Sequence, residues 1–321
     1  MTSRMTSGTT SRTTRLHLHD HGGEGTPLLL LHGAGRSHAD WAAAAPALRA
    51  AGHRVLAVDL PGHGRSPDRS PWTFDGVVAD LAETLRAYGA EGAVPVGHSL
   101  GGMLAARYAV AHPGATPAAV SLDGFGWGTP GRHPDAERVR ELSRVAAGAV
   151  APAGHPERQA AYAEGFGIPR ERAEAAAREA ARPLPDGTWQ TLPERAAALE
   201  MLDAMDTLDV FALLARVDCP LLLIRAERPQ PPVPGMEWFD ALMESWNRGL
   251  DTDLAHLTRS RPDSVTVTGV DATHAMLLEE PEAVATAVTD FLATATATAT
   301  TTVTAAATAT AALGGRGPTR R

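Results

Sequence analysis

The sequence predicts an α/β fold, in which a doubly wound and mostly parallel sheet carries a helical segment inserted between two of its strands. Three observations predict this fold class. Short apolar segments alternate with helical segments over residues 15–123, the alternation stops over residues 124–217, and it resumes over residues 218–292. Strands that alternate with helices of this length form parallel sheets that are covered by helices on both faces.

The first half of the sheet is built from short apolar segments. Residues 27–31 are a proline followed by four leucines, a continuous run that is typical of a strand buried on both faces. Residues 74–88 place apolar side chains at helical spacing, which predicts an amphipathic helix. The expected strands are residues 15–19, 27–31, 53–58, 93–96 and 118–122, and the expected helices are 39–51, interrupted by Pro46, 74–88 and 100–111.

Pro95 conflicts with the strand expected around it. This strand belongs at the centre of the sheet, and proline lacks the N–H group that a ladder hydrogen bond needs. We therefore expect the strand to be short or bulged at Pro95.

Residues 124–217 contain no convincing strand. Their helical segments are rich in Ala, Glu and Arg, which favour helices, so this region is expected to be a helical cap. The helices expected in it are residues 135–150, 170–182 and 194–205. After the cap, strands are expected at 220–226 and 264–268, with a long helical stretch at 236–259 between them and a last helix at 282–292.

Both ends of the chain have compositions that do not support a core. Residues 1–14 are mainly Ser, Thr, Arg, Gly and Met, and residues 293–312 are nearly all Ala and Thr. Side chains of this kind bury too little apolar surface to offset the entropy of ordering the chain. Residues 1–14 and 293–321 are therefore expected to be disordered.

The composition excludes several classes of function. The chain has 29 basic and 37 acidic residues, and its net charge of −8 argues against partners such as nucleic acid or anionic membranes. The single cysteine, Cys219, excludes an intrachain disulfide and a zinc-finger framework. The longest aliphatic run, Leu28–Leu31, is too short to cross a bilayer, and residues 1–14 lack the apolar region of a secretory signal. We therefore expect a cytoplasmic protein with a small-molecule substrate.

The pattern Gly-x-Ser-x-Gly occurs at Gly97–Gly101, between a predicted strand and a predicted helix. A tight strand-to-helix turn thrusts the central side chain clear of the backbone, and the flanking glycines remove side chains that would clash. Ser99 is therefore the candidate nucleophile. The backbone N–H of Leu100 lies at the helix N-terminus, where it points at an oxyanion formed beside Ser99.

Two further segments supply candidate partners for Ser99. The run Leu30–Gly35 follows a buried strand, and its small residues make the N–H of Ala34 the natural second oxyanion donor. His32 in this run is expected to hold the loop by hydrogen bonds. Among the 13 histidines, His274 stands just past the last predicted strand, which suits a general base.

Together these segments resemble the α/β-hydrolase family, and Asp59–Ser66 also matches the family's loop after the strand that precedes the nucleophile unit. The resemblance covers residues 16–292, with residues 124–217 in the place of the family's cap. It implies no cofactor and no metal. The roles that it implies are nucleophile for Ser99, base for His274, and backbone oxyanion hole for Ala34 and Leu100.

The family also uses a carboxylate that orients the base, which completes a catalytic triad. The position of this acid in the sequence departs from the family pattern. The family usually has an Asp in the loop after the strand that follows the cap, and here residues 224–234 contain none. Glu227 is available in that loop but comes very soon after the strand. Asp123 ends the strand after the nucleophile helix, the other position that the family uses, so we expect Asp123 to orient His274. The alternative for Asp123 is a turn residue before Gly124.

The resemblance implies a serine hydrolase that cleaves a carboxylic ester, thioester or lactone through an acyl-enzyme on Ser99. The alternatives are a non-catalytic small-molecule receptor or scaffold on the same fold, and a cofactor-free haloperoxidase-like or acyltransferase-like activity. Trp41, Phe125 and Trp127 are candidate substrate contacts, although each is equally suited to packing. The sequence leaves the oligomeric state open.

Overall fold

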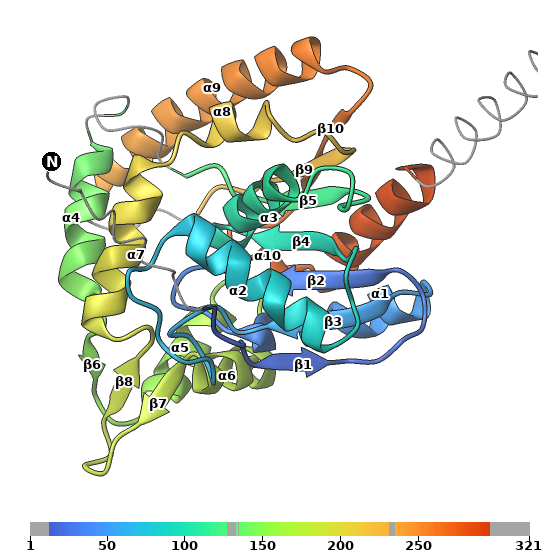
Figure 1. Cartoon of the computed structure of the whole chain (residues 1–321). Coiled ribbons are helices and arrows are strands. Elements are labelled where there is room, and N and C mark those ends of the chain that lie inside the picture. Colours follow the sequence, from blue (N-terminus) through green and yellow to red (C-terminus); the bar gives the residue numbers. More distant parts are fainter. Residues whose placement is uncertain (1–12, 127–132, 134, 231–234, 296–321) are drawn as a thin grey trace, which may run out of the picture.

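The structure is a computed structural model that describes residues 13–126, 133, 135–230 and 235–295. In these residues a seven-stranded sheet has the order β1-β3-β2-β4-β5-β9-β10 (Figure 1). β1 runs antiparallel to β3, and every other neighbouring pair in this sheet is parallel. The expectation of a doubly wound, mostly parallel sheet is confirmed.

The strands of this sheet follow the expected segments to within a few residues. β4 accommodates Pro95 without a bulge, because β5 pairs with β4 only from Val96 onward and leaves β2 as the only neighbour at residue 95. The bounds are β1 Leu18–Asp20, β2 Pro27–Leu31, β3 Arg54–Val58, β4 Val94–His98, β5 Ala119–Leu122, β9 Leu221–Ala226 and β10 Val265–Val270.

The helices that pack on the sheet also follow the expected segments, with one division. The single helix expected over residues 39–51 is split into two pieces, and Pro46 lies in the first turn of the second, where proline is well tolerated. The bounds are η1 His38–Trp41, α1 Ala45–Ala50, α2 Phe74–Ala87, α3 Leu100–Ala111, α9 Glu237–Ser260 and α10 Met276–Glu279, followed by a C-terminal helix over residues 281–295.

The core has two parts, one on each face of the sheet. Side chains alternate between the faces along β2, so Leu29 and Leu31 join one cluster and Leu28 and Leu30 join the other. The first cluster packs against α2, α3 and α9, and the second packs against α1 and the C-terminal helix. Burial on both faces accounts for the continuous apolar sequence of β2.

A mostly helical segment is inserted between β5 and β9, at the left of Figure 1. It also contains a small antiparallel sheet, which corrects the expectation that this region lacks strands. The strands are only two or three residues long, too short to give an alternating pattern in the sequence. The bounds are α4 Ala136–Ala146, β6 Val150–Ala151, α5 His155–Glu164, α6 Arg170–Glu179, β7 Ala181–Pro183, β8 Trp189–Thr191, α7 Arg195–Thr207 and α8 Val210–Leu214.

Residues 1–14 and 293–321, which the composition predicts to be disordered, lie mostly outside the described residues, since 1–12 and 296–321 are not described. Near the first described residue, the backbone N–H of Thr14 donates to Asp80 Oδ1 at 2.7 Å. At the other end, the C-terminal helix continues past Leu292 to residue 295. In the described part of the chain, the structure contains no helix with the length and apolar character that a membrane crossing requires.

Candidate active site

Ser99 lies in the turn between β4 and α3 with a backbone conformation that is rare for a residue with a side chain, φ 55° and ψ −119°. The turn depends on close backbone packing. A Cβ atom on Gly97 would lie 1.9 Å from the carbonyl oxygen of Gly101, and one on Gly101 would lie 2.2 Å from that of Leu31. Such a conformation costs of order 1–3 kcal/mol, which the surrounding structure must offset. The turn presents the side chain of Ser99 to a cavity.

His274 and Asp123 meet at the same edge of the sheet. Asp123 follows β5 with φ 48°, and His274 follows β10. The ring nitrogen Nδ1 of His274 lies 2.6 Å from Asp123 Oδ2, and Asp123 Oδ1 accepts from the backbone N–H of Ala226 at 3.3 Å. The side chain of Asp123 is 8% exposed and that of His274 is 47% exposed. Asp123 therefore holds one nitrogen of the ring while the imidazole faces the cavity.

This contact sets the charge of both groups. Burial alone raises the pKa of Asp123, but the hydrogen bond and charge of His274 outweigh it, so the pKa of Asp123 is lowered. Burial alone lowers the pKa of His274, but the hydrogen bond and charge of Asp123 outweigh it, so the pKa of His274 is raised. The pair thus combines an ionised carboxylate with an imidazole of increased basicity.

Glu227, the other carboxylate considered as the acid, points elsewhere. Its backbone N–H donates to the carbonyl oxygen of Val270 at 3.0 Å. Its side chain lies over Gly269 of β10, where a Cβ atom would be 1.8 Å from Glu227 Oε1. Of the two carboxylates, the structure brings Asp123 to His274.

The loop that carries His274 is held by two groups that the sequence did not reveal. Glu279 accepts hydrogen bonds from the backbone N–H of Thr273 at 3.0 Å, from the hydroxyl of Thr273, and from Arg228 Nη2 at 2.9 Å. His98 Nε2 donates to the carbonyl oxygen of His274 at 2.7 Å. Burial lowers the pKa of His98 to about 3, so its ring is neutral. The contacts of His98 with His274 and of Arg228 with Glu279 join distant segments of the chain and leave no local signal.

The segment after β2 contributes Gly33, Ala34 and Arg36 to the lining of the cavity. As expected, His32 holds this segment, since Nδ1 donates to the carbonyl oxygen of Gly33 at 2.8 Å and Nε2 accepts from the backbone N–H of Leu60 at 2.9 Å. Ala34 lines the same cavity as Ser99, and Leu100 is the first residue of α3, with Ser99 at the N-cap position. Ala34 therefore shares the cavity with Ser99, and Leu100 follows Ser99 directly in the chain.

The cavity has a volume of about 280 Å³ and a mostly apolar lining. Helices α5 and α6 both contribute residues to its lining, together with Ser99 and His274. In the described residues no hydrogen bond joins Ser99 Oγ to His274, and catalytic hydrogen bonds often tighten only when substrate binds. The lining residues are Gly33, Ala34, Arg36, Asp40, His98, Ser99, Gln159, Tyr162, Ala163, Phe166, Ile168, Ala173, Ala177, Gln230, Thr273, His274, Ala275, Leu277 and Leu278.

The aromatic substrate contacts proposed from the sequence require correction. Trp41 is 0% exposed in the core cluster beneath α1, and Phe125 is 2% exposed in the cluster on the opposite face of the sheet. Neither lines the cavity, because apolar packing holds both inside the core. Trp127 lies outside the described residues.

Tyr162 and Phe166 supply the aromatic lining instead. They belong to α5 and the turn after it, a helix that the sequence analysis did not identify. Its signal is local, with Pro156 and Glu157 in the first turn and alanines along the helix.

Comparison with known proteins gives a family match over most of the sheet-forming chain. The model described as "Alpha/beta hydrolase family" matches residues 28–287. Lipase LipV of Mycobacterium tuberculosis is 44% identical over 88 residues, which are 27% of this chain and 31% of the lipase. The putative carbamate hydrolase RutD of Variovorax paradoxus is 28% identical over 214 residues, which are 66% of this chain and 77% of that protein.

The match to several curated relatives is partial, since the chain spans less than a third of the length of LipV and 26% of epoxide hydrolase B of M. tuberculosis. Solved structures agree in fold over most of their length. E-2-(acetamidomethylene)succinate hydrolase superposes with a TM-score of 0.66 at 22% identity, covering 86% of this chain and 94% of that chain. A marine microorganism esterase superposes with a TM-score of 0.62 at 18% identity, covering 86% and 99%.

Proposed function

The chain belongs to the alpha/beta hydrolase family, and on that basis we propose that it is a serine hydrolase that cleaves a carboxylic ester, thioester or lactone. The observation that carries the proposal is the contact of 2.6 Å between His274 Nδ1 and Asp123 Oδ2 beside a cavity that Ser99 and His274 both line. Nucleophile, base and orienting carboxylate are the three groups that acyl transfer through a serine requires.

In the proposed mechanism, Ser99 Oγ attacks the acyl carbonyl carbon while His274 Nε2 takes the hydroxyl proton. The negative charge that develops on the carbonyl oxygen is stabilised by the backbone N–H groups of Ala34 and Leu100. The tetrahedral intermediate collapses, the bond to the leaving group breaks, and His274 returns its proton to that group. Water then attacks the acyl-enzyme with His274 again as base, which releases the acid and regenerates Ser99.

Asp123 has two tasks in this mechanism. Its carboxylate fixes the tautomer of His274 with the proton on Nδ1, which leaves Nε2 free to accept from Ser99. It also stabilises the imidazolium that forms during each proton transfer, in agreement with the raised pKa of His274.

Residues 124–217 act as a cap in this proposal, and their α5–α6 hairpin roofs the acyl pocket. An apolar cavity of about 150 Å³ holds one benzene ring. The cavity here is about 280 Å³, so we infer an acyl group of roughly six to ten carbons. The names lipase, esterase and hydrolase of the similar proteins are consistent with such substrates.

The proposal is tested by labelling with a fluorophosphonate probe together with p-nitrophenyl ester turnover. The unaltered chain should react with the probe at Ser99 and hydrolyse esters. Ser99→Ala should lose labelling and several orders of magnitude in kcat while it keeps its fold, because only binding and oxyanion contacts remain. Wild-type turnover by Ser99→Ala would exclude Ser99 as nucleophile. A folded chain that neither reacts nor turns over esters would favour a receptor or scaffold.

A further inference from the structure

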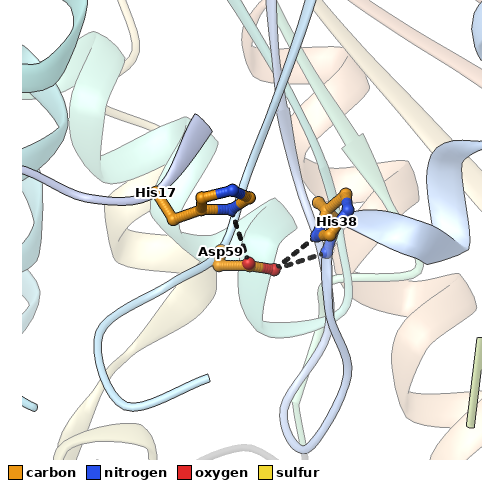
Figure 2. A group of neighbouring side chains, drawn as sticks. All are labelled: His17, His38 and Asp59. Carbon is orange, nitrogen blue, oxygen red and sulfur yellow. Dashed lines mark hydrogen bonds and ion pairs between the residues drawn. The ribbon is translucent and has the colours of Figure 1, made fainter. Parts of the chain in front are cut away.

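A second cluster of polar side chains lies outside the cavity. Figure 2 shows His17, His38 and Asp59 converging from three elements: the segment before β1, the start of η1, and the end of β3. Asp59 lies between the two imidazole rings. Its Oδ2 is 2.9 Å from His17 Nδ1, and its Oδ1 is 2.9 Å from His38 Nδ1.

We propose that His17, His38 and Asp59 bind a divalent first-row transition metal ion of the zinc class. The three residues offer two imidazole nitrogens and one carboxylate, donors that these ions accept readily. The donor atoms already lie within 4.8 Å of one another. They come from segments that are distant in the sequence, so the fold itself assembles them.

The carboxylate is held in a fixed orientation. Its oxygens accept hydrogen bonds from the backbone N–H groups of His38 at 2.8 Å and Arg65 at 3.0 Å. Asp59 is 0% exposed, and a Cβ atom on Gly64 would lie 2.3 Å from its Cγ, so the loop leaves it little room to turn. Outer hydrogen bonds of this kind orient a metal ligand before the ion arrives.

The charge at Asp59 also favours a cation. In the described part of the chain, the ion-pair partners of this buried carboxylate are the rings of His17 and His38, which carry charge only when protonated. Hydrogen bonds from the two imidazoles and two backbone N–H groups already stabilise this buried carboxylate, and a cation beside it would stabilise it further. A divalent ion between the three groups would supply a permanent positive charge.

The geometry requires only a modest closure. Zinc bonds of about 2.0–2.1 Å in a tetrahedral site separate the ligand atoms by roughly 3.3 Å. The ion would therefore draw the two rings toward each other by on the order of an ångström and lengthen the two Nδ1–Oδ contacts from 2.9 Å. A neutral imidazole moves its proton from Nδ1 to Nε2, and the freed Nδ1 lone pair binds the ion. The side chain of His17 is 29% exposed, which leaves an entry path. Water would complete the coordination.

The bound ion would be structural. None of the three residues lines the cavity, but His38 opens the short helix that follows the Ala34 segment. The ion would link the edge of the sheet to that segment and stiffen the junction. The proposal is independent of the proposed hydrolase function.

The test uses the full chain without a polyhistidine tag, stripped of metal by a chelator. Cobalt(II) is added to follow its visible absorption bands, and zinc binding is measured by calorimetry. The variants are His17→Gln and His38→Gln. The control is the double variant His19→Gln/His21→Gln, because alternate histidines on an edge strand also chelate metals.

We expect one equivalent of zinc and a cobalt spectrum of low coordination number. His17→Gln should weaken zinc binding by at least about 30-fold, since even loss of an outer hydrogen bond to a ligand costs 10–100-fold. Zinc at a hundredfold excess over the Kd of the unaltered chain should raise the Tm of that chain by about 4 °C and the Tm of His17→Gln by no more than about 1.5 °C. Ser99→Ala should bind zinc like the unaltered chain.

Three results would overturn the proposal. One is the absence of a cobalt band at millimolar cobalt in the unaltered chain. The second is unchanged zinc affinity in both His17→Gln and His38→Gln. The third is loss of binding in His19→Gln/His21→Gln with retention in His17→Gln, which would assign the ion to the exposed edge strand.

Discussion

Single residues in the cavity carry the proposed chemistry, and Asp123 is the residue whose role is most open to test. Its carboxylate contacts His274, whereas Glu227 lies over Gly269. The two residues are therefore a matched pair. Asp123 follows β5 and contacts His274, whereas Glu227 follows the neighbouring strand β9 and lies away from His274.

Asp123→Asn should lower kcat by about 10²–10⁴ with little change in KM, because a wrong tautomer of His274 harms the transition state more than substrate binding. Glu227→Gln should cost less than about tenfold, since it makes no contact with His274. Steady-state kinetics on a p-nitrophenyl ester measures both. The reverse order of effects would make Glu227 the acid.

The raised pKa of His274 predicts the pH dependence of activity. The base must be neutral, so kcat/KM should fall as the pH drops through the pKa of His274, and the midpoint of this acid limb should lie above the ordinary value of 6.5. In Asp123→Asn the carboxylate charge is lost, and the pKa of His274 should fall. NMR titration of the imidazole measures this independently of activity. An acid limb below pH 6.5 in the unaltered chain would contradict the prediction.

At the scale of elements, two segments shape the site without supplying its reactive groups. The α5–α6 hairpin lines the cavity, and Glu279 at the end of α10 holds the loop that carries His274. Substitutions in these two segments leave Ser99, His274 and Asp123 unchanged. They therefore test the shape of the cavity and the position of His274 separately from the reactive groups.

The hairpin should set the length of the acyl group. Ala177 lines the cavity from α6, so Ala177→Leu should shift the optimal p-nitrophenyl ester toward shorter chains by about two to three carbons, because the larger side chain fills cavity volume. Ala175→Leu is the matched control, since Ala175 is exposed on the same helix and does not line the cavity. Equal optima in the two variants would show that the hairpin does not bound the acyl pocket.

Glu279 is a positioning residue in this arrangement. Glu279→Gln retains the shape of the side chain but replaces one acceptor oxygen by a donor, so it no longer accepts from Thr273 and Arg228 together. We expect kcat to fall by about 10- to 100-fold at nearly constant KM, because the base is displaced from its productive position. The control is Glu280→Gln, an exposed neighbour. A loss of stability with unchanged kcat would assign Glu279 a purely structural role.

At the scale of the whole molecule, the helix near the C-terminal end of the chain helps to cover one face of the sheet. The C-terminal helix contributes Val284, Val288 and Leu292 to the second core cluster. Residues 296–321 are Ala- and Thr-rich and end in a Gly- and Arg-containing run, which offers little apolar surface to bury.

A chain that ends at residue 295 should therefore match the parent in Tm and in ester turnover. A chain that ends at residue 283 should be severely destabilised, because it loses the apolar side chains that cover one face of the sheet. Thermal unfolding measures both. A decrease of more than about 5 °C in the chain that ends at 295 would indicate that the removed residues contribute about 2 kcal/mol or more of stability.

The sequence by itself determined what depends on local patterns. Alternation of apolar strands and helices fixed the fold class, and the glycines around Ser99 marked the strand-to-helix turn, since both features follow from backbone sterics and side-chain spacing over a few residues. It also left two candidates, Asp123 and Glu227, for the carboxylate that orients His274, because parallel strands end at one edge of the sheet.

Only the tertiary structure decided which distant groups meet. It brought Asp123 to His274 across 151 positions of the chain, buried Trp41 and Phe125 in the core, and formed the cavity roof from α5 and α6. It also brought His17, His38 and Asp59 together, although no local pattern in the sequence predicts that they meet. Such contacts arise from the packing of whole elements, and packing depends on shape and burial over the entire domain.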